Sequence, residues 1–205
     1  MPFRAGTPAV LILGLALLGL ASGAGAPAAV QAPRTYAIAD APADLRPAIQ
    51  RGDMAIIALQ SAVLSELTRE LGRGGAVAAI SFCHLDTTGL ARRIGRQEGI
   101  VAGRTSDRLR NPSNAPAPWA APIVERYAGR RAGGLDGFAV DLGETVGVMR
   151  PIAHRRMCAT CHGPADALSP AVAAELRRRY PADRATGFRE GDLRGWFWVE
   201  VPKAR

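Results

Sequence analysis

The chain has 205 residues, of which 48% are hydrophobic and 21% charged, and its formal net charge is +8 with a sequence pI of about 10.6. This length fits one domain with a core of ordinary size. The basic residues are dispersed, and no basic stripe interleaved with aromatic residues occurs, which argues against a nucleic-acid partner. We interpret the charge as a solvated basic surface, with an acidic protein partner or anionic lipid as the alternative.

The N-terminus has the pattern of a secretory leader. Arg4 provides a positive charge, residues 10–20 form an uncharged apolar segment, and residues 21–26 are small. The pattern predicts a signal peptide over residues 1–24 and export, in bacteria to the periplasm. The alternative is an uncleaved membrane anchor, for which this apolar segment is short and rich in glycine. No later segment is long and apolar enough to span a bilayer, so we expect no membrane span after cleavage.

Residues 25–43 are rich in Ala and Pro and predict a disordered tether. A folded domain over residues 44–205 is expected to follow, starting with a long helix that Asp44 caps and that residues 72–75 end. Apolar residues recur along this helix at roughly helical spacing, namely at Ile49, Met54, Ile57, Leu64, Leu67 and Leu71. We interpret Met54 as a core residue rather than an iron ligand.

The rest of the chain mixes helical and extended patterns. Helices are predicted over 76–85, 86–96, 119–129 and 170–179, and strands over 99–106, 138–142, 145–152 and 195–201. The second and third strands form a hairpin across residues 143–144. Because the strands are few and the hairpin is local, we predict an α+β fold in which helices flank an antiparallel sheet.

One short motif carries most of the chemistry. Residues 158–162 read C-x-x-C-H, the attachment sequence for c-type haem, in which Cys158 and Cys161 bind the porphyrin vinyl groups and His162 binds the iron. A redox dithiol or half of a zinc site is the alternative. A second C-x-x-C and a βαβ pattern are both absent from the sequence. The motif therefore predicts one covalent haem c.

The residues alone do not identify the sixth iron ligand. Cys83 is the odd cysteine in an exported chain, and the other candidates are His84, Met149, His154 and Met157. His154 and Met157 lie close to the attachment sequence, so their reach to the far side of the ring is poor. Cys83 could equally be a small buried apolar residue.

Several motifs in a fixed order resemble one known family. They are Cys83 within its helix, Arg104-Thr105-Ser106, Arg110-Asn111-Pro112 with Asn114 and Pro116, Trp119, Arg150-Pro151-Ile152, the residues 158–163, Tyr180-Pro181, and residues 185–187 and 191–195. This set is similar to the exported single-haem c-type domain with a PAS-like fold, long catalogued as a domain of unknown function. Its members include stand-alone haem proteins and the sensory domains of kinases and chemoreceptors. Ala120 and the bulky Trp196 depart from the family pattern.

The resemblance implies a PAS-like sheet with haem on one side and with His162 and Cys83 as the iron ligands. Arg104, Arg110 and Arg194 are candidates for pairing with the haem propionates, because a guanidinium fork suits a carboxylate. The alternative for these arginines is an ordinary surface role or the fixing of a loop.

We therefore expect an exported haem c protein that acts in electron transfer or redox sensing with an unidentified protein partner. A haem-based gas or redox sensor that signals through a partner protein is the alternative. A peroxidase-type enzyme is less favoured, because it needs an open coordination position and a distal acid-base group, for which His84 is the only hint.

Overall fold

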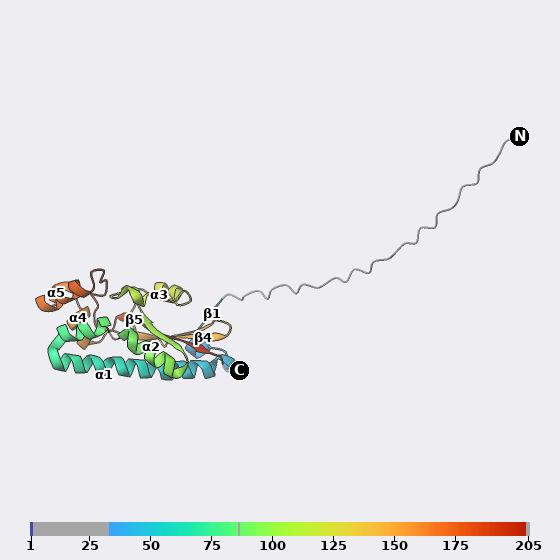
Figure 1. The fold of residues 1–205 in the computed structure, drawn as a ribbon, viewed down its shortest axis with the longest axis horizontal. Helices are drawn as coiled ribbons and strands as arrows, with labels where there is room; N and C mark the ends of the chain where they lie inside the picture. The colour runs from blue at the N-terminus through green and yellow to red at the C-terminus, as the bar shows by residue number, and fades with distance from the viewer. Residues whose placement is uncertain (2–32, 86, 204–205) are drawn as a thin grey trace. The chain divides into compact units, whose positions relative to one another are not determined.

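The computed structural model describes Met1, residues 33–85 and residues 87–203. Apart from Met1, the predicted signal peptide and the tether as far as residue 32 lie outside the described residues. Five strands form one antiparallel sheet in the order β1-β3-β4-β5-β2. Figure 1 shows the long helix α1 (Arg46–Leu85) running along one side of this sheet. The strands are β1 (Arg34–Ala37), β2 (Val101–Thr105), β3 (Phe138–Asp141), β4 (Thr145–Ala153) and β5 (Leu193–Pro202). The predicted hairpin corresponds to β3 and β4, which pair Phe138 with Met149.

The helices of the described residues correspond to predicted helices, except for the single turn α4 (Ala159–His162) in the attachment sequence, which was not predicted. They are α1 (Arg46–Leu85), α2 (Thr87–Glu98), α3 (Ala121–Arg126), α4 (Ala159–His162) and α5 (Pro170–Arg179). Gly74 and Gly75 interrupt α1, with Gly75 at a φ of 68°, a conformation that glycine adopts without strain. The break lies where the sequence predicts the first helix to end. The predicted α+β class, a PAS-like antiparallel sheet flanked by helices with a long N-terminal helix, is confirmed.

The prediction of a disordered tether over residues 25–43 is wrong from Arg34 onward. Strand β1 pairs with β3, with Arg34 opposite Asp141, and two 3-10 turns, Ile38–Asp40 and Ala43–Leu45, lead into α1. The segment holds few large apolar residues, so its composition resembles a linker. Its order instead comes from backbone hydrogen bonds to the neighbouring strand and from burial of Ala41 in the core.

Helix α1 presents a different face to the sheet from the predicted one. Met54 is 68% exposed and Ile57 is 57% exposed, so the core positions predicted for them are wrong. Of the predicted apolar positions, Ile49 does lie in the core against the sheet. The other residues of this face are small or apolar and recur at helical spacing, namely Ala48, Gly52, Ala55, Ile56 and Leu59. A Cβ atom on Gly52 would lie 2.9 Å from Val148 Cγ2, so the absence of a side chain lets this turn approach the strand closely.

Each face of the sheet has its own core. On one face, α1 and α2 pack on residues such as Val148, Phe197 and Val199. On the other, α3 and the loops around it cover Met149 and Trp196. The two departures from the family pattern both lie in this second core, where Ala120 is fully buried and Trp196 fills the space.

An ion pair joins the long helix to the sheet. Arg150 in β4 donates from Nε to Asp53 Oδ1 at 2.7 Å and from Nη2 to Oδ2 at 2.5 Å. The two parallel bonds fix the orientation of α1 on its strand more firmly than a single contact would. Among the helices that the structure describes, none has the length and apolar character needed to cross a bilayer.

Candidate functional site

One cavity of about 340 Å³ brings the predicted site residues together. It lies between the second half of α1, the end of β2, the start of β5 and the segment around α4. All seven predicted residues line it: Cys83, Arg104, Arg110, Cys158, Cys161, His162 and Arg194. Leu64, Leu67 and Leu71 of α1 contribute apolar lining to the same cavity.

The attachment sequence lies directly after the sheet. Strand β4 ends at Ala153, and a 3-10 turn, Arg156–Cys158, leads into the single turn of α4. This places Cys158 and Cys161 one helical turn apart, and His162 follows at once. No disulfide forms among the three cysteines. Burial raises the pKa of the Cys161 thiol, the nearby Arg110 partly offsets this rise, and Cys161 is therefore a thiol at neutral pH.

The imidazole of His162 has a defined orientation. Its Nδ1 lies 2.7 Å from the carbonyl oxygen of Ala185, which can only accept, so Nδ1 carries the proton and donates it. Burial, followed by the positive charges of Arg194 and Arg110, holds the pKa of His162 well below its ordinary value. The ring is therefore neutral at pH 7, and the lone pair on Nε2 is available to a metal.

Arg110 is already engaged by the protein. It donates from Nε to Asp183 Oδ2 at 3.0 Å, and from Nη2 to the carbonyl oxygens of Cys161 at 2.5 Å and Ala185 at 3.2 Å. Asp183 in turn accepts from the backbone N–H of Ala185 at 2.7 Å. Arg110 thus joins the attachment turn to the segment that orients His162, which supports the loop-fixing role for this arginine.

Arg194 differs from Arg110 in its surroundings. Burial, with Arg104 and Arg110 nearby, lowers the pKa of Arg194 to about 9. Its Nε is buried and has no hydrogen-bond partner within the described parts of the chain. A buried, crowded cation with an unsatisfied donor is costly unless an anion approaches it. Arg104 and Arg194 therefore make this side of the cavity suitable for carboxylate groups.

The other candidate iron ligands differ in whether they line the cavity. Met149 is fully buried in the core on the α3 face, and His154 is buried beside Phe188. Neither is among the described residues that line the cavity. Met157 does line the cavity, but it is 44% exposed and lies next to Cys158 on the attachment turn. The side chain of His84 lies outside the described part of the structure.

Several residues of the site escaped the sequence analysis. Tyr180 lines the cavity, and burial, with the nearby Cys83 as a second cause, raises its pKa to about 12. Asp183 and Phe188 organise the segment that follows. All three lie in or beside the stretch 180–188, part of which the family resemblance already marked. The family motifs in this stretch could have pointed to these residues, although the resemblance assigned them no role.

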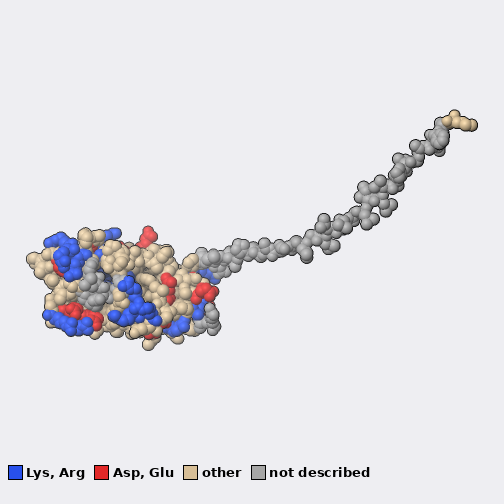
Figure 2. Space-filling view, viewed as in Figure 1, with Lys and Arg blue, Asp and Glu red and all other residues tan. Residues whose placement is uncertain are grey.

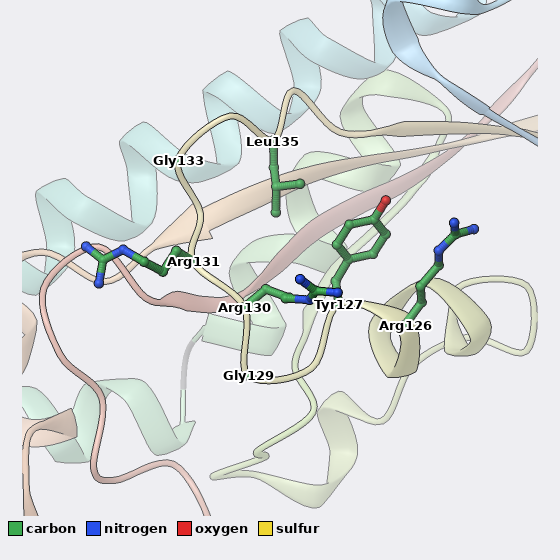
Figure 3. A pocket seen from close by; sticks show the side chains of 7 residues that line it. All are labelled: Arg126, Tyr127, Gly129, Arg130, Arg131, Gly133 and Leu135. Carbon is green, nitrogen blue, oxygen red and sulfur yellow. The ribbon is translucent and has the colours of Figure 1, made fainter.

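A second hollow, of about 580 Å³, lies in the loop after α3 (Figure 3). Arg126, Arg130 and Arg131 line it, but the guanidinium groups of Arg126 and Arg131 point to opposite sides (Figure 3). It therefore presents no convergent set of cations. On the face seen in Figure 2, Lys and Arg form several separate groups, which agrees with the dispersed charge of the sequence.

Comparison with known proteins identifies the family. The sequence model of the Tll0287-like family (Tll0287) matches residues 34–202, which is most of the chain. The chain belongs to the Tll0287-like family. The family prediction made from the motifs is thus confirmed, and the matched range includes β1 and every predicted site residue.

One solved structure of this kind is described as the crystal structure of the cyanobacterial heme-protein Tll0287. Its sequence is 28% identical to this one, the match covers 58% of this chain and 71% of that one, and the TM-score is 0.48. No curated protein matches the chain.

Proposed function

We propose that this Tll0287-like chain is an exported protein that carries one covalent haem c in the cavity and works in electron transfer or redox sensing. Cys158 and Cys161 would hold the haem through thioethers, and His162 and Cys83 would bind its iron. The observation that carries the proposal is that the C-x-x-C-H residues and a third cysteine, far away in sequence, line the same cavity.

The residues around the cavity fit this cofactor. A cavity of about 340 Å³ is within the usual size range for cofactor sites. The leucines of α1 and Phe197 of β5 supply apolar contacts for a macrocycle. On the polar side, the unsatisfied Nε of Arg194 and the neighbouring Arg104 suit two propionates. When bound, the haem supplies a one-electron redox centre.

The protein supplies the ligands and their orientation. His162 offers Nε2 because its Nδ1–H is held by the Ala185 carbonyl, and a hydrogen bond of this kind also raises the donor strength of the imidazole. Cys83 projects from the second part of α1 into the cavity. As a thiolate it would be an anionic, strongly donating ligand that stabilises ferric iron. The potential is then lower than with Met/His ligation.

Two axial ligands from the protein leave no open coordination position, which favours an electron carrier or a redox sensor over an enzyme. The partner we propose is an unidentified redox or signalling protein, and the +8 charge would suit an acidic one. Location outside the cytoplasmic membrane follows from the leader and from the attachment chemistry, and it is part of the proposal.

The test of attachment is acid-acetone extraction of the purified protein. We expect the colour to stay with the wild-type polypeptide and with Cys83→Ala, which keeps both attachment thiols. The Cys158→Ala/Cys161→Ala variant should release its haem into the organic phase. Colour lost from the wild type, or kept by the double variant, contradicts the proposal.

Carbon monoxide distinguishes the carrier from the gas sensor. Reduction lowers the charge on iron, so a thiolate is held less firmly and can protonate and leave. A large shift of the ferrous absorption spectrum with CO at neutral pH supports ligand exchange and a sensor. An unchanged spectrum at saturating CO supports a plain electron carrier.

A further inference from the structure

The backbone around Phe188 is joined to the backbone of His162. The Phe188 N–H donates to the His162 carbonyl at 3.0 Å, and the Gly187 N–H donates to the Gly163 carbonyl at 2.7 Å. The Ala185 carbonyl also accepts from His162 Nδ1. Residues 185–188 therefore contact both the main chain and the ring of His162.

The ring of Phe188 adds a contact to the imidazole itself. Phe188 is 1% exposed, and its ring centroid lies 6.4 Å from that of His162 with the two planes at 84°. This edge-to-face arrangement is a favoured aromatic geometry. One hydrogen bond from Nδ1 limits the imidazole at a single atom, whereas a ring packed against it also limits its rotation about χ2.

Arg108 covers Phe188 from outside the cavity. Its guanidinium carbon lies 3.5 Å from the Phe188 ring centroid, which is a close cation-π contact. Its Nη1 donates to the Thr186 carbonyl at 2.9 Å, and its backbone N–H donates to Ser106 Oγ at 3.2 Å. One side chain thus holds both the ring of Phe188 and the main chain just before it.

Phe188 also has a buried neighbour in His154. The His154 ring stacks on it at 5.8 Å with an angle of 15° between the planes. Neither ring nitrogen of His154 has a hydrogen-bond partner among the described residues, so His154 contributes to this packing as a neutral aromatic ring. The pKa of His154 is lowered by burial first and by Arg194 second, which agrees with the neutral form.

We propose that Arg108 is a positioning residue that acts through Phe188 to fix the orientation of the His162 ring, and so sets the ligand geometry and the reduction potential of the site. The proposal rests on the proposed haem function. It adds a role for Arg108 and Phe188. Neither residue is a proposed iron ligand, and neither is among the described residues that line the cavity.

Two losses are expected when Arg108 is replaced. Without Arg108, the Phe188 ring keeps only the more distant Arg194 guanidinium, 5.0 Å from its centroid, and the stacked His154. The ring can then shift, and the His162 ring takes a range of orientations instead of one. Burial lowers the pKa of Arg194 in the cavity wall, and Arg108 is one of the charges that lower it further. The positive charge of Arg108 would favour the ferrous state of a haem held there, so its removal would favour the ferric state. At a fixed applied potential we expect the ferric-to-ferrous ratio to rise about threefold, equivalent to roughly 30 mV for a one-electron couple.

The experiment compares wild-type holoprotein with Arg108→Gln, Phe188→Leu and Arg108→Lys, and with Arg189→Gln as the matched control. Arg189 is adjacent to Phe188 and exposed, so its replacement removes the same charge without touching the ring. Covalent haem is measured first in each variant, followed by the ferric EPR spectrum and a redox titration.

We expect broadened low-spin EPR lines in Arg108→Gln and Phe188→Leu, and wild-type lines in Arg189→Gln. Arg108→Lys keeps a cation over the ring and should restore most of the potential. If Arg108→Gln does not accumulate with haem, Phe188→Leu is compared with Arg189→Gln instead, and EPR lines in Phe188→Leu as narrow as those of Arg189→Gln overturn the proposal.

The positioning role is overturned if the EPR lines and reduction potentials of Arg108→Gln and Phe188→Leu match those of Arg189→Gln. That result would not contradict the proposed haem site. Absence of covalent haem from the wild type instead overturns the proposed function itself.

Discussion

Two stretches of the long helix α1 before its break use apolar residues for different purposes. We call residues 46–59 the first half and residues 60–71 the second half. In the first half, Ile56 and Leu59 pack on the sheet, and Gly52 lets the helix approach β4 closely. In the second half, Leu64, Leu67 and Leu71 line the cavity. The comparison teaches that apolar residues at helical spacing on one helix can build the fold in one stretch and a binding wall in the next.

The largest effect is expected for a core residue of the first half. Leu59→Ala removes a fully buried side chain and should lower the free energy of unfolding by about 2–5 kcal/mol. Denaturant unfolding measures this in the wild type and in a Cys158→Ala/Cys161→Ala background that attaches no haem. The loss should be similar in both, because Leu59 lies outside the described cavity lining.

Leu67→Ala is the matched change in the second half. Because Leu67 lines the cavity, we expect a loss below about 1 kcal/mol in the background without haem and a clearly larger loss in the holoprotein. Equal losses in the two backgrounds would remove the distinction between the halves.

Gly52→Ala tests the close contact of the first half with the sheet. The new Cβ atom would lie 2.9 Å from Val148 Cγ2 and 3.1 Å from Val199 Cγ2, so side chains in the core must move. We expect a destabilisation of about 1–3 kcal/mol, seen as a lower denaturation midpoint with an unchanged slope. A neutral result would show that the helix can withdraw from the strand without cost.

Gly72→Ala is the smallest expected effect and has the opposite sign. Gly72 is an exposed residue of α1, and no heavy atom lies within 4 Å of a Cβ added there. Alanine favours the helix over glycine by roughly 0.5–1 kcal/mol, so the thermal midpoint should rise slightly. A lower midpoint would indicate that the helix needs flexibility just before its break at Gly74.

The sequence predicted those parts of the fold whose local signals agree with the packing. The hairpin of β3 and β4, the glycine break in α1 and the helix α5 were all readable locally. In the structure, the Ser169 side chain caps α5 by accepting from the Val172 N–H. Strand β1 was missed because four residues with little apolar area gain their order from pairing with β3. The buried face of α1 was misplaced because its inward residues include Ala and Gly, which hydrophobic periodicity under-weights.

For the site, the sequence predicted which residues come together but not how they are connected. C-x-x-C-H has a fixed local spacing, and the resemblance supplied Cys83 and the arginines. The bonds of Arg110 to Asp183 and to the Cys161 carbonyl depend on loops far apart in the chain, as does the contact of Arg108 with Phe188. No local pattern encodes such pairings.

The central proposal is that Cys83 and His162 would both bind the haem iron, and the ferric absorption and EPR spectra of Cys83→Ala test it most directly. The account predicts a low-spin wild type with thiolate charge-transfer bands. Cys83→Ala should lose these bands, keep its covalent haem and have a higher reduction potential. Spectra and potential identical to those of the wild type would show that Cys83 is a buried apolar residue and not a ligand.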